Sequence, residues 1–379
     1  MIDVKQILTE NILPFWMERM VDNENGGFYG RISGDGALHA DADKGAILCG
    51  RLLWSFSAAY RVVGKPEYLE MATRAKDYLL EHFVDCEEGG VFWSLTADGR
   101  PKETKKQFYA IGFAIYGLSE YVRAAGDNAA LAAAKDLYRD IEAYSKDPSG
   151  GGYFEACTRD WQRIEDMRLS DKDENEAKTM NTHLHIMEPY TNLLRVWDNP
   201  ELRRNLRGLI EIFLDKIYDP STGHLGLFFD EAWVRKDAMV SYGHDIEASW
   251  LLVEAAEVLG DEQLLARVKA VSARIYDAAK EGLQPDGSMI YEIRRDGSVD
   301  RDRHWWVQAE TAVGAHWAGD TRVRDGALKF IEEHLMDKEG GEWHWSVRAD
   351  GSVNLDDDKA GFWKCPYHNS RMCLELLTR

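Results

Sequence analysis

Two kinds of hydrophobic segment alternate along the chain. Residues 44–62 and 108–118 are apolar nearly all round, which is typical of helices buried on every side. Residues 67–83 carry apolar side chains at helical spacing on one face only, which predicts an amphipathic surface helix. A Gly-Lys-Pro break at residues 64–66 separates the first buried segment from this surface helix. The pattern therefore predicts pairs of helices, one buried and one at the surface.

A glycine turn followed by aromatic residues recurs six times between these helices. Most copies run through alternating aromatic and polar residues to an Asp-Gly pair, which is a local signal for a β-hairpin. The copies begin at Gly26, Gly89, Gly151, Gly223, Gly287 and Gly340. Their period of roughly 60 residues leaves room for two helices between successive hairpins.

Twelve helices follow when a leading helix at about 4–20 and a closing helix at about 366–377 are added. Six buried helices inside six surface helices form an all-α (α/α)6 barrel, with short β-hairpins at the active-site end. No linker divides the chain, so we expect a single domain over residues 1–379. The acidic stretch 170–178 is a candidate lid, although a solvated loop is the simpler interpretation.

Composition narrows the classes of function. The formal net charge of -20 argues against nucleic-acid and membrane-surface binding, and suits a neutral small molecule. The 5 cysteines form no C-x-x-C pair. Residues 1–6 show no signal-peptide pattern and no run approaches 18 apolar residues, so we expect a cytoplasmic protein. The 13 Trp and 16 Tyr slightly favour a sugar ligand over a purely structural use of aromatic residues.

Polar residues in the first turns of the buried helices provide the candidate chemistry. These turns should all lie at the hairpin end of the barrel and converge on one cavity. The candidates are Lys44, Arg51, Tyr109, Asn181, His183, His185, His244, Glu247, His304, Trp305, Trp306, Gln308, Glu310, His368 and Asn369. A single buried histidine is more often a hydrogen-bonded core residue than a catalyst. Three at corresponding places in three repeats are harder to explain in that way.

Helical spacing pairs several of these candidates. Two pairs are four residues apart and share a helix face: Asn181 with His185, and Trp306 with Glu310. His244 and Glu247 are three residues apart and also share a face. Arg51 lies in an apolar stretch, where an unpaired charge is costly. It must therefore form a salt bridge, for example to Glu247 or Glu310, or hold a sugar oxygen.

Three chemistries compete for this set. Metal-dependent hydrolysis is disfavoured, because His183 and His185 are two residues apart on a helix and point to different faces, so we expect no metal. Glycoside hydrolysis would use carboxylates such as Asp245, Glu247 and Glu310, but leaves the histidines without a role. Proton transfer beside a sugar carbonyl uses histidine as base and then as acid, which suits epimerisation.

Five motifs resemble the N-acylglucosamine 2-epimerase superfamily, and within it the branch of cellobiose 2-epimerases. They are Glu-Asn-Gly-Gly-Phe-Tyr-Gly at 24–30, Asp-Lys-Gly at 43–45, Ser-Tyr-Gly-His-Asp-Ile-Glu at 241–247, Trp-Trp-Val-Gln-Ala-Glu at 305–310, and Lys-Cys-Pro-Tyr-His-Asn at 364–369. The likeness extends from the first helix to the C-terminus.

The resemblance implies conversion of the reducing-end glucose of a β-1,4-linked disaccharide to mannose, as in cellobiose to glucosyl-mannose or lactose to epilactose, without a cofactor. It assigns catalysis to three histidines and substrate binding to a further set of pocket residues. The histidines are His185, His244 and His368, and the binding residues are Arg51, Asn181, Glu247, Glu310 and the stacking Trp306 and Trp363, to which the helix positions add Tyr109.

In the implied mechanism the pyranose ring opens, and His244 or His368 removes the C2 proton. Arg51 and His185 hold the enediolate, which turns about C2–C3, and the other histidine returns the proton. Glu247 would orient His244. We expect a monomer. We also expect no nucleotide requirement, because the sequence has no phosphate-binding glycine loop. The alternatives are a D-mannose isomerase or 2-epimerase acting on monosaccharides, a glycoside hydrolase using Glu247 and Glu310, and a sugar-binding module.

Overall fold

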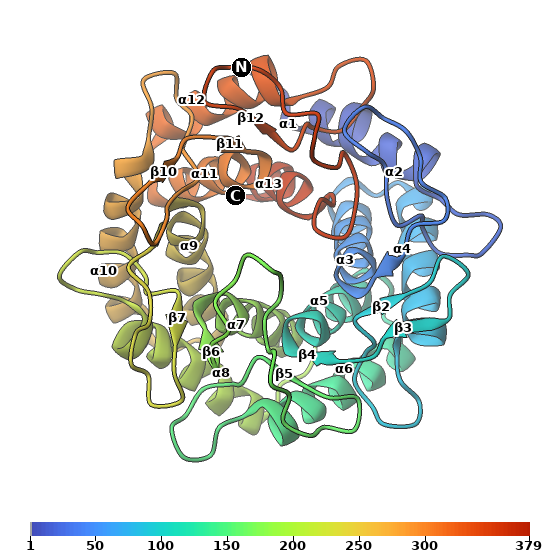
Figure 1. The fold of residues 1–379 in the computed structure, drawn as a ribbon, viewed down its shortest axis with the longest axis horizontal. Helices are drawn as coiled ribbons and strands as arrows, with labels where there is room; N and C mark the ends of the chain where they lie inside the picture. The colour runs from blue at the N-terminus through green and yellow to red at the C-terminus, as the bar shows by residue number, and fades with distance from the viewer. Residues whose placement is uncertain (1) are drawn as a thin grey trace.

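Within residues 2–379, which the computed structural model describes, twelve helices form two concentric rings (Figure 1). The inner ring consists of α3 (Ala46–Val63), α5 (Phe108–Ala125), α7 (Met180–Leu194), α9 (Tyr242–Leu259), α11 (Trp305–Ala318) and α13 (Tyr367–Thr378). The outer ring consists of α1 (Val4–Gln6) with α2 (Leu13–Arg19), joined by a π-helical segment into one rod, and of α4 (Pro66–Tyr78), α6 (Asn128–Asp140), α8 (Pro200–Ile212), α10 (Glu262–Ala279) and α12 (Thr321–Phe330). The predicted (α/α)6 barrel is confirmed. Met1, where the expected domain and the segment without a signal-peptide pattern both begin, lies outside the described residues.

The two rings differ in burial as the hydrophobic pattern predicts. Helix α3 is buried over 46–59, whereas α4 buries only four residues of one face. The break between them falls where expected: Gly64 has a positive φ of 81°, which a side chain would disfavour, and Pro66 opens α4. Helix α3 has the length and apolar composition of a membrane span, but its residues are mostly buried inside the barrel. That burial is typical of a core helix.

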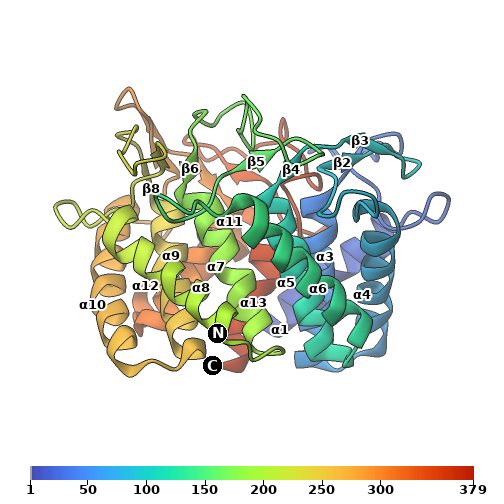
Figure 2. The same cartoon turned by 90° about the horizontal axis from the view of Figure 1, so that it is seen from below.

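Short strands at one end of the barrel link neighbouring repeats (Figure 2). The strands are β1 (Lys44–Gly45), β2 (Ser94–Leu95), β3 (Pro101–Glu103), β4 (Lys106–Gln107), β5 (Ala156–Cys157), β6 (Lys178–Thr179), β7 (Phe228–Phe229), β8 (Val240–Ser241), β9 (Glu292–Ile293), β10 (Val299–Asp300), β11 (Arg303–His304) and β12 (Ser346–Val347). The strand before an inner helix pairs antiparallel with the hairpin of the next repeat, as β1 does with β2 and β4 with β5. A bridge between Ile32 and Ala360 joins the first repeat to the last.

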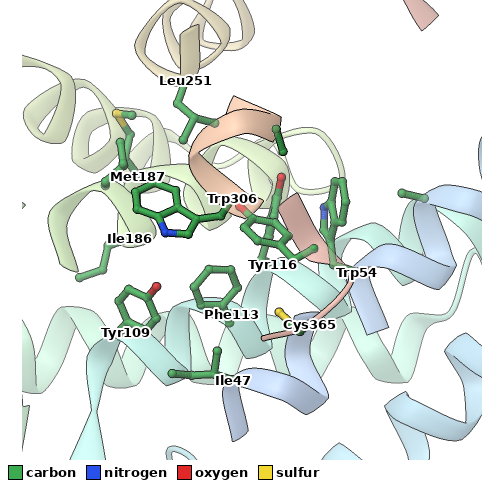
Figure 3. Close-up of a cluster of buried hydrophobic side chains, with 14 of the residues drawn as sticks. Ile47, Trp54, Tyr109, Phe113, Tyr116, Ile186, Met187, Leu251, Trp306 and Cys365 are labelled. Atoms are coloured by element: carbon green, nitrogen blue, oxygen red, sulfur yellow. The ribbon is translucent and has the colours of Figure 1, made fainter. Parts of the chain in front are cut away.

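Aromatic side chains from several inner helices fill the interior of the ring (Figure 3). Trp54 on α3 stacks on Tyr116 of α5 with ring centroids 5.2 Å apart, and Phe113 lies edge-on to Tyr116. Ile186 of α7 and Leu251 of α9 belong to the same cluster. The packed interior fixes the inner helices relative to one another, and therefore the residues at their N-terminal ends.

Candidate active site

A cavity of about 540 Å³ opens at the hairpin end of the inner ring. Its volume lies within the range of small-molecule sites. Nine of the ten predicted site residues line it: Arg51, Tyr109, Asn181, His185, His244, Glu247, Trp306, Trp363 and His368. They converge because each inner helix begins at this end, so that Asn181, His244, Trp306 and His368 all fall in first turns.

Two glycines let the inner helices approach closely enough to place these residues. A Cβ on Gly112 of α5 would come within 2.3 Å of the backbone oxygen of His185 on α7. A Cβ on Gly243 of α9 would meet the indole of Trp306 at 2.5 Å. Any side chain at either position would therefore displace a cavity residue.

Each of the three predicted catalytic histidines is anchored through Nδ1. His185 Nδ1 lies 3.0 Å from Glu188 Oε2, and His368 Nδ1 lies 2.7 Å from Glu310 Oε1. Because an ionised carboxylate only accepts, both rings carry the proton on Nδ1, which leaves Nε2 as the basic nitrogen. His244 Nδ1 is hydrogen-bonded to Ser241 Oγ at 2.7 Å. Within residues 2–379, Nε2 of these three histidines makes no hydrogen bond, which leaves it available to a ligand in the cavity.

Burial keeps these histidines in the neutral, basic form. It lowers the pKa of His368 to about 3 despite the hydrogen bond to Glu310. Burial also lowers the pKa of His244 to about 3, helped by the neighbouring His185 and His368. Burial likewise lowers the pKa of His185. A neutral imidazole is the form required of a general base.

Two tryptophans supply flat apolar walls. Trp306 packs against both His244 and His368, with ring centroids 4.9 and 5.5 Å apart. Trp363 lies 6.1 Å from Tyr109 and 5.9 Å from Trp93. The cavity thus presents indole surface beside the basic nitrogens.

Unpartnered polar atoms also mark the cavity as a ligand site. Among residues 2–379, Asn181 Oδ1, Glu247 Oε2 and Arg51 Nε are buried without a hydrogen-bond partner, and all three residues line the cavity. Buried polar atoms normally have partners. A hydroxyl-rich ligand would supply them.

The structure gives three of these residues partners that the sequence did not indicate. Arg51 forms no salt bridge in the described chain: its Nη2 donates to Tyr109 OH at 2.9 Å, and its guanidinium lies over Phe113 at 4.2 Å. Glu247 does not orient His244, whose Nδ1 partner is Ser241. Glu310 does not line the cavity but lies behind His368, which it anchors. Both carboxylates are held instead by a residue that sequence reasoning missed.

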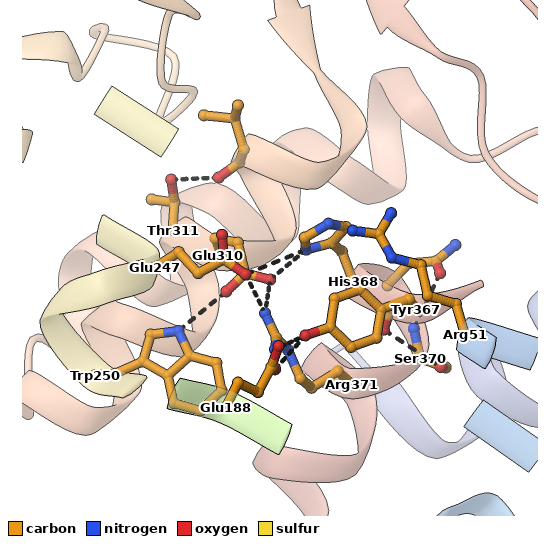
Figure 4. A network of polar contacts seen from close by, with 12 residues as sticks. Arg51, Glu188, Glu247, Trp250, Glu310, Thr311, Tyr367, His368, Ser370 and Arg371 are labelled. Atoms are coloured by element: carbon orange, nitrogen blue, oxygen red, sulfur yellow. Dashed lines mark hydrogen bonds and ion pairs between the residues drawn. The ribbon is translucent and has the colours of Figure 1, made fainter. Parts of the chain in front are cut away.

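That residue is Arg371, four residues beyond Tyr367 on α13. Its Nη2 donates to Glu247 Oε1 and to Glu310 Oε1, both at 2.6 Å (Figure 4). Its Nη1 pairs with Glu188, a second missed residue. The available signal was an arginine and a glutamate inside inner helices that are buried over most of their length, where each must find a partner.

A metal ion fits this arrangement poorly. Glu247, Glu310 and His368 lie close enough together to share an ion. However, the Arg371 guanidinium already binds the two carboxylates. His183 diverges from His185 as expected, since its ring bonds the backbone of Thr179 and Tyr153 outside the cavity. The predicted absence of a metal stays a prediction.

The other first-turn candidates separate into structural and cavity residues. Lys44 pairs with Asp22, Gln308 bonds the backbone of Met289, and Asn369 bonds Glu342. His304 lines the cavity and stacks on Tyr291 with ring centroids 4.0 Å apart.

The acidic loop predicted as a possible lid lies at the cavity. Ser170, Asp171, Lys172 and Asp173 are among the lining residues. Asp173 fixes the loop by accepting hydrogen bonds from the backbone and hydroxyl of Ser170. The loop therefore borders the cavity, while Asp171 and Lys172 are exposed as a solvated loop would be, and the lid stays a prediction.

Indole walls beside basic histidines, inside an (α/α)6 barrel, define the class as an enzyme that acts on carbohydrates. The sequence profile of the N-acylglucosamine 2-epimerase (GlcNAc 2-epimerase) family matches residues 27–371. The chain belongs to this family and is a carbohydrate epimerase, an isomerase, as the motifs indicated.

Relatives cover the whole chain. It is 60% identical over 383 residues to the cellobiose 2-epimerase of Bacteroides fragilis, covering 99% of this chain and 98% of that protein. Identity to the cellobiose 2-epimerase of Ruminococcus albus is 40% over 385 residues, covering 100% and 98%. The structure of cellobiose 2-epimerase from Bacillus thermoamylovorans superimposes with a TM-score of 0.94 at 38% identity, covering 99% of this chain and 97% of that one.

Proposed function

We propose that this enzyme epimerises C2 of the reducing-end glucose of a β-1,4-linked disaccharide, converting cellobiose to glucosyl-mannose and lactose to epilactose. The observation that carries the proposal is that His185, His244 and His368 come from three inner helices and line one cavity with Nε2 free. The names of the relatives described above support the choice of disaccharide.

The reaction needs a proton donor as well as bases, because the ring must open before C2 becomes acidic. Burial, and then the neighbouring Glu310 charge, raise the pKa of Glu247 well above the usual carboxyl range, so its cavity-lining carboxyl keeps a proton. In our proposal one of His244 and His368 accepts the O1 proton while Glu247 protonates the ring oxygen. The sugar is then an open-chain aldehyde.

Proton transfer at C2 follows. The neutral histidine of the pair removes the C2 proton, and the enediolate turns about C2–C3. The histidine protonated during ring opening then delivers its proton to the opposite face of C2. Ring closure returns a proton to O1 and restores Glu247, so protons balance over the cycle. The Arg51 guanidinium and His185 lie beside the cavity to stabilise the enediolate oxygens.

The disaccharide would be held by stacking and by the unpartnered polar atoms. In this proposal Trp306 packs on the reacting sugar beside His244 and His368, and Trp363 provides a second platform for the other sugar. Tyr109 and Asn181 bind hydroxyls, and Glu310 acts through His368. We further propose that the enzyme is a cytoplasmic monomer that requires neither cofactor nor metal.

Proton NMR of cellobiose incubated with the enzyme in D2O tests the proposal. The expected result is a glucosyl-mannose product with deuterium at C2. If cellobiose is untouched but mannose exchanges its C2 proton, the substrate is a monosaccharide and the disaccharide assignment is wrong. Deuterium at C1 of a ketose product would indicate an isomerase. Cleavage of the glycosidic bond would refute proton transfer and implicate the carboxylates.

A further inference from the structure

One guanidinium beneath the cavity joins three carboxylates (Figure 4). Arg371 pairs through Nη2 with Glu247 and Glu310, and through Nη1 with Glu188 and the Tyr367 hydroxyl. Its side chain is 1% exposed, and it does not line the cavity. It stacks between Trp250 and Tyr367, at 4.7 and 4.3 Å from the ring centroids. A residue in this position cannot touch a sugar, but it contacts the partners of residues that can.

Each of the three carboxyl groups connects Arg371 to a different residue or part of the site. Glu188 uses its other oxygen to anchor His185, whereas Glu310 uses the oxygen bound to Arg371 to anchor His368. The second oxygen of Glu310 accepts from Trp250 Nε1 at 3.0 Å. Glu247 uses one oxygen for Arg371, and its other oxygen is buried without a partner among residues 2–379. Arg371 is therefore the element shared by two histidine anchors and the cavity carboxyl.

We propose that Arg371 is a positioning residue for proton transfer: by binding Glu188 and Glu310 together, it orients His185 and His368 with Nε2 toward the sugar. This inference rests on the proposed function and deepens it. The role requires a planar fork, because two different nitrogens reach carboxylates contributed by α7, α9 and α11. A lysine ammonium supplies the charge without that geometry.

Charge balance gives the same residue a second effect. Burial raises the pKa of Glu310, but the Arg371 charge and the hydrogen bond from His368 outweigh it and lower that pKa below the usual range. Burial also raises the pKa of Glu188, but other groups outweigh burial and lower that pKa, the nearby Arg371 charge most of all. Ionised Glu188 and Glu310 are obligate acceptors, which fixes the Nδ1–H tautomer of their histidines.

The charged groups facing these histidines are few. His368 faces Glu310, Glu247, Arg51 and Arg371, and His185 faces Glu188 together with the two arginines. Arg371→Lys would keep the charge but lose the close contacts of the guanidinium, so less positive potential would reach both rings. Their pKa values should rise, so the pH below which the enzyme loses activity should rise as well.

The test is Arg371→Lys in the full-length enzyme with cellobiose. We expect kcat to fall by about 10- to 100-fold, as for other partners that orient a functional histidine. KM should change little because Arg371 does not line the cavity, and the acidic limb of the kcat/KM profile should move to higher pH. The matched control is Arg195→Lys. Arg195 Nη2 donates to Glu254 Oε1 at 2.7 Å, and neither residue lines the cavity. This substitution should leave kcat and the pH profile unchanged.

Nitrogen-15 NMR of histidine-labelled wild-type enzyme gives a second measurement that needs no Arg371 variant. His185 and His368, assigned with His185→Asn and His368→Asn, should show the Nδ1–H tautomer. The proposal is overturned if either ring is protonated at Nε2, or if Arg371→Lys keeps wild-type kcat and the wild-type acidic limb. A wild-type enzyme that exchanges no aldose C2 proton would instead refute the proposed function, while the tautomer measurement still reports on Arg371.

Discussion

The hairpin end of the barrel and the region beneath its cavity both bury charged side chains, but they differ in the ratio of cations to carboxyl groups. At the hairpin end, Lys44, Lys106 and Lys178 each pair with one aspartate, at 2.8, 2.9 and 2.7 Å. Each ammonium also donates to a backbone carbonyl of the neighbouring glycine turn. The aspartates, Asp22, Asp85 and Asp147, accept the backbone amides of the same turns. Charge and hydrogen bonding are thus matched locally; Arg159, which also binds Asp85, is balanced in turn by Glu87.

Beneath the cavity one arginine serves three glutamates. Arg371 binds Glu188, Glu247 and Glu310, so the cluster would carry excess negative charge if every carboxyl were ionised. Buried charges in excess are costly, so one group keeps a proton instead. Glu247 is that group, and its second oxygen has no partner in the described chain.

The difference separates structure from chemistry. A balanced, saturated pair has nothing left to offer a ligand, and it recurs in the repeats because each glycine turn must be fixed. An unbalanced cluster retains a transferable proton and an open hydrogen-bonding position, and it occurs where the three histidines meet. Four experiments test this distinction.

Replacing a histidine beside the cavity should have the largest effect. In His368→Asn the amide can still donate to Glu310, so the fold should survive, but the basic nitrogen is lost. We expect kcat to fall by about 10²- to 10⁴-fold, the usual contribution of a general acid or base. Deuterium incorporation at C2 of cellobiose measures it. Retention of most wild-type activity would show that His368 is not one of the two proton-transfer groups.

Breaking a balanced pair should cost stability without affecting chemistry. Lys44→Met leaves Asp22 buried without its counter-charge, so the free energy of unfolding should fall by about 3–5 kcal/mol. Urea titration measures this loss, and kcat of the folded fraction should be unchanged. A lower kcat in fully folded protein would contradict the separation between the two regions.

The close approach of neighbouring inner helices should matter both to stability and to catalytic activity. Gly112→Ala forces a Cβ against the His185 backbone, and we expect a loss of about 1–3 kcal/mol together with a lower kcat. The control is Gly208→Ala on outer helix α8, where a Cβ would meet nothing within 4 Å. That change should stabilise the protein by about 0.5–1 kcal/mol and leave kcat unaltered. Equal effects of the two substitutions would argue against close approach as the role of Gly112.

The smallest change is expected for the wild-type enzyme in mild acid. A histidine acts as a base only above its pKa, and burial lowers the pKa of His244 and His368 to about 3. kcat/KM should therefore change little between pH 7 and about pH 5, where a histidine with the usual value of about 6.5 would already be mostly protonated. A pH series on protein shown to remain folded tests this. A steep fall beginning near pH 6.5 would contradict the effect of burial.

Much of the site was predictable, because its residues obey local rules. His244, Trp306 and His368 fall in first turns of helices that begin at one end, so knowing the barrel places them together. The partners were less predictable. In the mechanism that the resemblance implies, Glu247 was expected to orient His244, yet Ser241 at the helix N-cap holds that ring. Arg371 lies one turn deeper, where helical periodicity shows only a buried face.

Hydrophobic periodicity, the recurring glycine turns and the placement of polar residues at helix starts together predicted the barrel, its active-site end and eight of the nine predicted site residues that line the cavity; the ninth, Trp363, came from the family resemblance. These features depend on local backbone geometry and on which face of a helix avoids water. The tertiary structure alone decided which charge meets which. Arg371 on the last helix binds glutamates on α7, α9 and α11, because closure of the ring brings α13 next to these helices. The most distant partner in the chain, Glu188, lies 183 residues before Arg371. Coulomb interactions in a buried interior depend on distances that no sequence spacing specifies.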